Sequence, residues 1–248
     1  MKLQGKTAIV TGGGRDIGRA CVMALAKAGA NVAINYHSSS EGAEAAVKEI
    51  EAAGGKAFCM QGDMTQEADV RALVAKTVEA YGSVDVLMPI TGSLVKRVPM
   101  SEMTIEHWNN VFAVNTTSSM LLTMCALPHM NDGGAIVNMA SQAARDGGGP
   151  GSIAYAASKG AVQTMTRGMA KELGPKIRVN AVNPGMIDTD FHNVFTKPEV
   201  RVNVANAAPL KREGSSEDVA NLAVYLASDD AAYVTGACVD INGGMLFS

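Results

Sequence analysis

Apolar runs and helical patterns alternate along the whole chain, and this alternation restricts the possible folds more than any other feature. Helical patterns occupy residues 17–29, 39–55, 67–82, 104–130, 154–174 and 216–228. Because strands separated by helices usually pair in parallel, this order predicts an α/β fold: a doubly wound parallel sheet of about seven strands with helices on both faces. The expected strands are residues 6–12, 31–36, 56–63, 84–90, 133–141, 177–185 and 236–244.

No linker, internal repeat or low-complexity stretch interrupts residues 1–248, so we expect a single domain. Hydrophobic residues make up 47% of the chain, which is sufficient for one large core. The least regular stretch, residues 186–214, follows the carboxyl end of an expected strand, where open α/β sheets bind ligands. We therefore expect residues 186–214, the lid segment, to cover the substrate.

Charge and composition disfavour several classes of function. The net charge is −3 and no block of Lys or Arg is present, which argues against a nucleic-acid partner. No apolar stretch is long enough for a membrane helix or a signal peptide, so we expect no membrane partner. The four cysteines form no CxxC pair and the four histidines are scattered. They indicate reduced thiols, a cytoplasmic protein and no metal site.

The sequence TGGGRDIG, residues 11–18 and here called the phosphate loop, joins the first expected strand to the first helix. Glycines also occur in plain turns, but a strand, a glycine-rich turn and a helix start are the context of dinucleotide binding. A tight turn and close backbone approach let the helix N–H groups reach a pyrophosphate. The loop residues expected at the cofactor are Gly12, Gly14, Arg15, Asp16, Ile17 and Gly18.

A carboxylate is unexpected in a phosphate loop. Asp16 stands at the start of the expected helix, where an acidic side chain caps free N–H groups and suits the positive end of the helix dipole. We therefore interpret Asp16 as a helix cap whose side chain turns away from the pyrophosphate. On this interpretation Asp16→Gly weakens folding or cofactor binding.

The end of the second strand bears on the choice of cofactor. Sites for NAD usually place Asp or Glu there to bind the ribose 2′-hydroxyl. Here the strand ends AINYHSSS, and the first acidic residue, Glu41, is already in the next helix. Arg15, His37 and Ser38 offer groups for a 2′-phosphate, and the less favoured alternative for Arg15 is a solvated surface charge. NADPH is therefore favoured over NADH.

The sequence YAASK places Tyr155 and Lys159 on one face of a helix. An adjacent ammonium lowers the pKa of a tyrosine, which then serves as proton donor to a carbonyl or acceptor from an alcohol. Such pairs also occur on solvated helix faces, but Ser141 ends the preceding strand and its hydroxyl can hold the substrate oxygen. Asn115 is a fourth polar candidate, and its simpler interpretation is a residue that kinks or caps the helix.

Taken together, the motifs resemble those of the short-chain dehydrogenase/reductase family, over essentially the whole chain. The motifs that carry the resemblance are TGGGRDIG, Asp63 after the third strand, VFAVNTTS, IVNMAS, YAASK, RVNAVNPGMIDT and VTGACVDINGG. The resemblance implies a single Rossmann domain and NADPH-dependent reduction of a carbonyl, or oxidation of an alcohol.

The resemblance also implies roles for individual residues. Tyr155 would donate the proton, Ser141 would orient the substrate, Lys159 would tune Tyr155 and bind the ribose, and Asn115 would hold a relay water. Asp63 would accept from the adenine amino group, beside Met64. Further cofactor contacts would come from Gly92, Pro184, Gly185, Ile187 and Thr189. The family also implies a homotetramer, in which the helices at 104–130 and 154–174 pair across one interface.

The chain departs from the family pattern at three places. Asp16 replaces the last-but-one glycine of TGxxxGxG, and the strand end usually reading NNAG is PITG, in which only Gly92 is kept. The segment between Ser141 and Tyr155 is one residue longer than is common in the family. Because the two loops pack together in this family, we expect Asp16 to be linked to Thr91 in PITG.

The substrate is less constrained by sequence. Cations near the expected pocket could bind a carboxylate, although each could be a solvated charge, and the low aromatic content of 4% disfavours a large flat substrate. The stretches AARDGGG and IDTDFH are similar to those of reductases of alginate-derived uronates, so the expected substrate is a keto sugar acid such as a 4-deoxy-5-keto uronate. The alternatives are a 3-oxoacyl-[acyl-carrier-protein] reductase and a catalytically silent dinucleotide sensor. Candidate substrate residues are Ser141, Gln142, Arg145, Tyr155 and His192, with Lys96, Arg97, Lys197 and Arg201 as further cations.

Overall fold

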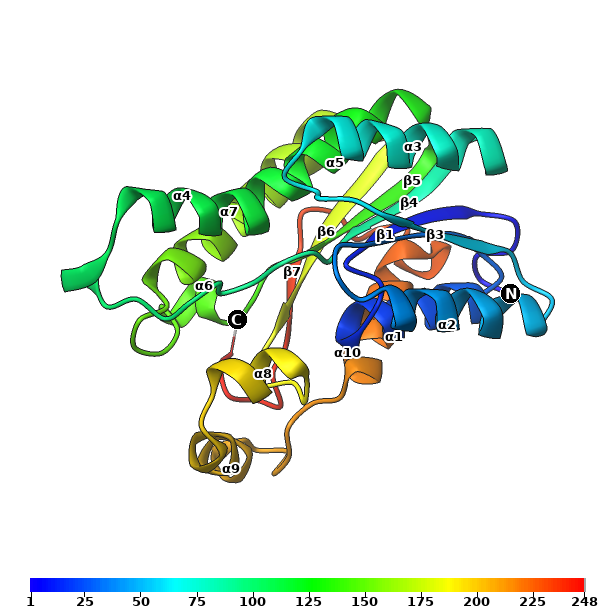
Figure 1. Ribbon diagram of the computed structural model, residues 1–248. Helices are drawn as coiled ribbons and strands as arrows, with labels where there is room; N and C mark the ends of the chain where they lie inside the picture. The colour runs from blue at the N-terminus through cyan, green and yellow to red at the C-terminus, as the bar shows by residue number, and fades with distance from the viewer. Residues whose placement is uncertain (248) are drawn as a thin grey trace.

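A computed structural model describes residues 1–247 of the protein. Its centre is a seven-stranded sheet in the order β3-β2-β1-β4-β5-β6-β7, and every neighbouring pair is parallel (Figure 1). The predicted fold class, a doubly wound parallel sheet in one domain, is confirmed. The strands are β1 Thr7–Thr11, β2 Asn31–Tyr36, β3 Ala57–Gln61, β4 Val84–Pro89, β5 Met130–Met139, β6 Ile177–Pro184 and β7 Cys238–Ile241.

Helices cover both faces of the sheet, with α1, α2 and α10 on one face and α3, α5 and α7 on the other (Figure 1). Each helix turns an apolar stripe toward the strands, as the 3.6-residue periodicity predicts. The helix α10 begins with a capping box, in which the Ser215 hydroxyl accepts from the Asp218 N–H and the Asp218 carboxylate accepts from the Ser215 N–H. The covering helices are α1 Asp16–Lys27, α2 Ser40–Ala52, α3 Glu67–Tyr81, α5 Ser118–Ala126, α7 Ile153–Leu173 and α10 Ser216–Ala227.

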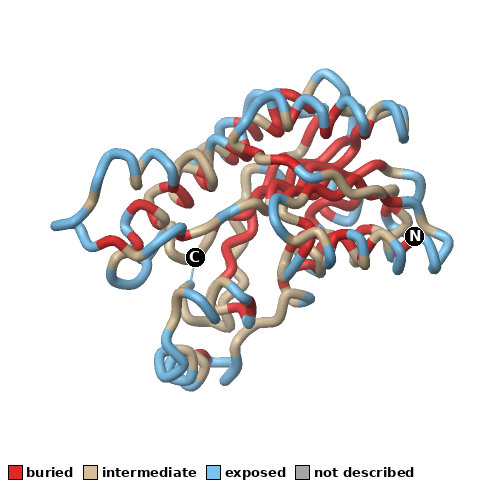
Figure 2. The backbone as a smooth tube through the Cα atoms, in the orientation of Figure 1, coloured by how far each residue is buried: buried red, intermediate tan, exposed pale blue. Residues whose placement is uncertain are grey.

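The core is divided by the sheet into two apolar layers (Figure 2). Val22, Leu25 and Leu226 fill the layer under α1 and α10, and Leu73 and Leu122 fill the layer under α3 and α5. Because both faces are covered, the strands are nearly continuous hydrophobic runs rather than alternating ones.

The strand order reverses between β1 and β4, and this reversal determines where a ligand can bind. From β1 the chain moves outward to β2 and β3, whereas β4 returns to pair with the other side of β1. The loops that follow β1 and β4 therefore diverge at the carboxyl edge of the sheet. In open α/β sheets this point forms the ligand crevice.

The helical region predicted at 104–130 is continuous in direction but not regular. It consists of α4 Ile105–Phe112, a π-helical turn Ala113–Thr117, α5 and a 3₁₀ turn Leu127–His129. Within residues 1–247 the stretch Ile105–His129 alone is long and apolar enough to cross a membrane by length and composition. Its residues Leu122 and Ala126 are fully buried against the sheet, which is the packing of a core helix.

The lid segment contains two short helices, α8 Asp190–Phe195 and α9 Pro198–Ala207, which project from the carboxyl edge of the sheet (Figure 1). Its two ends meet in an isolated parallel bridge between Ile187 and Gly214. The remaining helices are the short α6 Ala143–Asp146 and the 3₁₀ turns Met100–Glu102 and Asp229–Ala231.

Two glycines provide a test of the packing in this fold. A Cβ atom added at Gly18 would lie 2.0 Å from the carbonyl oxygen of Gly12, whereas nothing lies within 4 Å of one added at Gly168, inside α7. We expect Gly18→Ala to lower the free energy of unfolding by at least about 2 kcal/mol, because backbone must move. Gly168→Ala, the control, should raise it by about 0.5–1 kcal/mol. Urea denaturation measures both, and equal effects would contradict the packing described.

Candidate active site

A cavity of about 930 Å³ runs along the carboxyl edge of the sheet. It begins at the phosphate loop and ends under the lid segment, and residues at the ends of six strands, β1 to β6, line it. Of the residues predicted at the cofactor or substrate, all but three lie in this lining. Those present are Gly12, Arg15, Asp16, Ile17, Gly18, His37, Ser38, Asp63, Met64, Gly92, Ser141, Gln142, Tyr155, Lys159, Pro184, Gly185, Ile187, Thr189 and His192.

Gly14, Asn115 and Arg145 are the three predicted residues that lie outside the lining. A Cβ atom on Gly14 would lie 2.2 Å from the Ser39 hydroxyl, so this glycine allows the loop to pack on the start of α2 rather than reaching the cavity. The glycines of the phosphate loop thus let its backbone pack closely against itself and against α2, which leaves a cradle lined by backbone. Such a cradle at the start of α1 fits a pyrophosphate.

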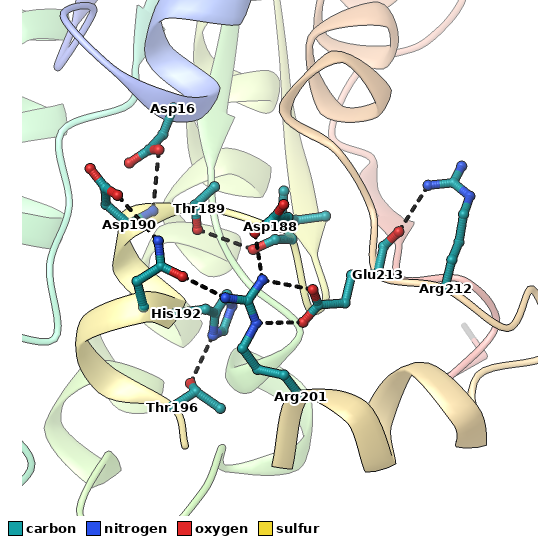
Figure 3. A network of polar contacts seen from close by, with 11 residues as sticks. Asp16, Asp188, Thr189, Asp190, His192, Thr196, Arg201, Arg212 and Glu213 are labelled. Atoms are coloured by element: carbon teal, nitrogen blue, oxygen red, sulfur yellow. Dashed lines mark hydrogen bonds and ion pairs between the residues drawn. The ribbon is translucent and has the colours of Figure 1, made fainter. Parts of the chain in front are cut away.

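Asp16 does not cap its own helix, and the predicted role is wrong. The N-cap of α1 is Arg15, without a side-chain hydrogen bond, and Asp16 has φ of 48°. This left-handed conformation favours glycine and costs a residue such as Asp about 1 kcal/mol. The Asp16 carboxylate instead accepts from the backbone N–H of Asp190, at 3.2 Å, in the lid segment (Figure 3). Partial burial raises the pKa of Asp16.

Thr91 contacts the phosphate loop, but not at Asp16. A Cβ atom on Gly12 would lie 3.1 Å from the Thr91 nitrogen, and the Thr91 N–H donates to the Thr11 hydroxyl at 3.3 Å. The two loops therefore pack together as expected. The link from Asp16 to Thr91 is not present, because Asp16 bonds to Asp190.

The end of the cavity next to β2 has a positive group and no acidic residue at the end of that strand. His37 and Ser38 lie there, exposed, beside Arg15. The guanidinium of Arg15 is largely exposed and pairs with Asp190 at 3.4 Å. Across the cavity the Asp63 carboxylate is fixed by the N–H and the hydroxyl of Thr65, at 2.9 and 2.8 Å.

Ser141, Tyr155 and Lys159 lie together at the far end of the cavity, where Ser141 follows β5 and the other two share α7. The Lys159 ammonium is 3% exposed and donates to the Met139 carbonyl at 2.7 Å. Burial lowers the pKa of Lys159 to about 8, so the amine is mostly charged at neutral pH.

The effect on Tyr155 differs from the predicted one. Burial raises the pKa of Tyr155, and a hydrogen bond with Ser141 offsets part of this rise. The Lys159 ammonium lies 5.8 Å from the centroid of the Tyr155 ring. Tyr155 is therefore a protonated phenol in this structure, which suits a proton donor.

Asn115 lies in the π-helical turn and is buried behind the cavity wall. Its amide donates to the carbonyls of Ser93, at 2.7 Å, and Val111, at 2.8 Å, and its side-chain oxygen accepts from the Ser93 N–H at 3.0 Å. The side chain is thus engaged with protein and holds the loop after β4, and the predicted relay water at Asn115 stays a prediction. In that loop a Cβ on Gly92 would lie 3.1 Å from the Lys159 ammonium.

The segment after β6 brings Pro184, Gly185, Ile187 and Thr189 to the cavity. Opposite Gly185, the side-chain oxygen of Gln142 is buried and has no hydrogen-bond partner within residues 1–247. An unpaired buried acceptor next to a glycine is a position for an amide or hydroxyl donor of a ligand. This acceptor therefore fits the amide N–H group of a nicotinamide carboxamide at this end.

Two of the predicted substrate cations do not offer a charge to the cavity. Arg145 pairs with Asp240 and donates to the Phe247 carbonyl at 2.7 Å, so it holds the C-terminal segment instead of a substrate. Burial, with a smaller effect from Arg201, lowers the pKa of His192 to about 4, so His192 is neutral. Its Nδ1 lies 2.9 Å from the Thr196 hydroxyl (Figure 3).

Of the other cations, Arg201 bonds to Glu213, Asp188 and Asn193 inside the lid segment (Figure 3). Lys96 and Lys197 are exposed outside the cavity lining. Arg97 does line the cavity, and it donates to the carbonyls of Phe195 and Pro150, both at 2.8 Å.

The sequence analysis missed an aromatic group at the substrate end. Phe191 and Phe195 lie one helical turn apart in α8, and Phe191 packs on Tyr155 with ring centroids 5.6 Å apart. Their four-residue spacing was a signal that low overall aromatic content concealed. The other apolar groups at this end are Leu94, Val114, Val194, Val200, Val204 and Met245.

Known proteins match the chain over its whole length. Residues 12–246 match the family model described as enoyl-(acyl carrier protein) reductase. The chain belongs to the short-chain dehydrogenase/reductase family. An uncharacterised oxidoreductase of Methylorubrum extorquens is 40% identical, over 98% of this chain and 99% of that protein. The 3-oxoacyl-[acyl-carrier-protein] reductase FabG of Staphylococcus aureus is 37% identical, over 97% and 98%.

A solved structure of a blue fluorescent protein from a metagenomic library, in complex with NADPH, has a TM-score of 0.94 and 37% identity, and the match covers 100% of both chains. Family membership, together with the arrangement of the site, identifies the chain as an NAD(P)-dependent oxidoreductase.

The buried His192 predicts a pH dependence of stability. Because its pKa in the folded protein, about 4, lies below the ordinary value of 6.5, the unfolded chain takes up this proton first as the pH falls. The contribution is present above pH 6.5 and is lost as the pH falls toward 4. Urea denaturation at several pH values should show a smaller acid loss for His192→Asn than for wild type. The same change at the exposed His129 is the control, and equal slopes for all three would contradict the prediction.

Proposed function

We propose that the protein is an NADPH-dependent carbonyl reductase, or alcohol dehydrogenase in the reverse direction. One observation carries the proposal: the half-buried Tyr155 hydroxyl, which desolvation keeps protonated, lies with Ser141 and Lys159 at one end of a cavity whose other end is a backbone phosphate cradle. A proton donor and a dinucleotide site in one cavity are what hydride transfer to a carbonyl requires.

In the proposed reaction the bound dihydronicotinamide supplies the hydride to the carbonyl carbon. Tyr155 gives its hydroxyl proton to the carbonyl oxygen, so that an alcohol forms. Ser141 donates a hydrogen bond to the same oxygen and orients it. The Lys159 ammonium, 5.8 Å from the centroid of the Tyr155 ring, would stabilise the negative charge left on Tyr155 and would donate to a ribose hydroxyl. Asn115 supports this end by fixing the loop at Ser93.

NADPH is the proposed cofactor, in preference to NADH. The absence of a carboxylate at the end of β2 and the positions of Arg15, His37 and Ser38 around the cavity support a 2′-phosphate there. The related blue fluorescent protein was solved with NADPH. We propose that Asp63 and Met64 contact the adenine, and that Pro184, Gly185, Ile187 and Thr189 face the nicotinamide.

For the substrate, the apolar lining under the lid segment favours a carbonyl next to an aliphatic group, as in a 3-oxoacyl thioester. The likeness to FabG supports this class. A 4-deoxy-5-keto uronate is the second candidate, and only Arg97 of the cations at this end of the described cavity supports it, since Arg145 and His192 do not. Reduction assays with acetoacetyl thioester and with the keto uronate, at equal NADPH, decide between the two.

We further propose that the lid segment, residues 186–214, closes over the substrate, and that the protein is a cytoplasmic homotetramer. Free cysteines at all four positions support a reducing compartment. Exposed Ile105, Met120 and Met124 along α4 and α5, and Ile153 at the start of α7, support an interface between copies on this side. Light scattering at several concentrations measures the assembly.

Tyr155→Phe tests the proposed chemistry. Loss of the proton donor should lower kcat by about 100-fold or more, because general acid catalysis contributes on this scale. The affinity for NADPH, measured by fluorescence titration, should change little. A wild-type protein that binds NADPH but turns over neither carbonyl, with Tyr155→Phe indistinguishable from it, would instead support a dinucleotide sensor.

Arg15→Gln tests the cofactor. Removing the guanidinium should raise the Kd for NADPH about 10- to 100-fold, the scale of a charge-assisted bond to phosphate, and leave the Kd for NADH unchanged. Isothermal titration with both cofactors measures the ratio. An equal loss for NADH and NADPH would show that Arg15 does not bind the 2′-phosphate.

A further inference from the structure

Asp16 occupies a backbone conformation that suits glycine, and glycine is the simpler residue for this turn. Its φ of 48° is one of three positive values at non-glycine residues within 1–247. Strained conformations of this kind persist where neighbouring contacts hold them. The contact that holds Asp16 comes from the lid segment, 174 residues away in the sequence.

The carboxylate of Asp16 reaches the start of α8. It accepts from the Asp190 N–H at 3.2 Å (Figure 3). The adjacent Arg15 guanidinium lies 3.4 Å from the Asp190 carboxylate. The phosphate loop therefore binds Asp190, the first residue of α8, at two points: the Asp190 backbone N–H and the Asp190 carboxylate. At the other end of α8, Arg97 donates to the Phe195 carbonyl at 2.8 Å.

The residue after Asp190 touches the catalytic tyrosine. Phe191 packs on Tyr155 at 5.6 Å between ring centroids, and its own position is supported by Phe195 and His192, both at 5.1 Å. A shift of the start of α8 thus moves the ring that covers Tyr155. The residue that contacts the phosphate loop, Asp190, and the residue that contacts the proton donor, Phe191, are therefore neighbours in the chain.

We propose that Asp16 is a positioning residue for carbonyl reduction: it fixes α8 to the phosphate loop, so that Phe191 covers Tyr155 and the substrate carbonyl. The expected effect on kinetics rests on the proposed function, whereas the contact between Asp16 and α8 does not. Asp16 acts through Asp190 and Phe191, and it touches no reacting atom.

Two variants separate this role from a purely structural one. Asp16→Gly removes the carboxylate and also relieves the left-handed backbone, so its melting temperature should equal or exceed that of wild type. Asp16→Asn keeps a side-chain oxygen acceptor, and asparagine tolerates the left-handed region. Asp16→Asn is therefore the matched control and should retain the position of α8.

Hydrogen exchange of the cofactor-free protein measures α8 directly. In Asp16→Gly, peptides covering residues 186–197 should exchange about fivefold faster or more, the effect expected for loss of one hydrogen bond. The peptides of α1 should exchange as in wild type, and Asp16→Asn should behave as wild type throughout. Unchanged exchange in 186–197, or a lowered melting temperature with faster exchange in α1, would overturn the proposal.

Kinetics with NADPH and acetoacetyl thioester give a second readout. For Asp16→Gly the KM for the carbonyl should rise about fivefold, with a smaller change in kcat and a Kd for NADPH that is unchanged or lower. Phe191→Leu should raise the same KM, and the double variant should show less than the product of the two effects. If the rise in KM in the double variant equals the product of the two single effects, Asp16 does not act through Phe191. If wild type reduces no carbonyl, the proposed function fails while the exchange measurement still decides the contact.

Discussion

The reversal of strand order between β1 and β4 is the constraint on which the rest of the structure depends. It makes the two following loops diverge, and most of the site is then built from strand ends that face the opening, with Tyr155 and Lys159 added from α7. The phosphate loop follows β1, Gly92 follows β4, Ser141 follows β5 and the lid segment follows β6. The site is thus assembled from the ends of six strands and from α7, without any one of them needing an unusual fold.

Within that frame, burial sets the protonation states. Lys159 lies in the interior with a backbone carbonyl as its hydrogen-bond acceptor, and its lowered pKa still leaves it mostly charged at neutral pH. Tyr155 is half-buried beside it, and desolvation raises its pKa so that it keeps its proton. The helix α7 brings Tyr155 and Lys159 together because they are four residues apart. The packing of α7 against β5 determines which of the two side chains is charged.

The sequence predicted the order of strands and helices and the positions of Ser141, Tyr155 and Lys159 in one cavity, because periodicity and local spacing encode both. The prediction from sequence failed where a side chain pairs with a residue far away in the chain, and where burial determines the protonation state. Arg145 meets Asp240, 95 residues away, and no local pattern indicates that pair. His192 is neutral because the lid segment desolvates it, and neutrality is a property of packing that residue type cannot show.

The role of Asp16 in the phosphate loop was also wrongly predicted because its partner is remote in the sequence. A capping role was the natural local explanation, yet the left-handed backbone at residue 16 makes glycine the less strained choice. Two features that looked independent in the sequence, the departure at Asp16 and the IDTDFH stretch, are in fact one contact. A deviation from a family motif is therefore best interpreted through the residue that it meets, because only that contact explains why the strain is retained.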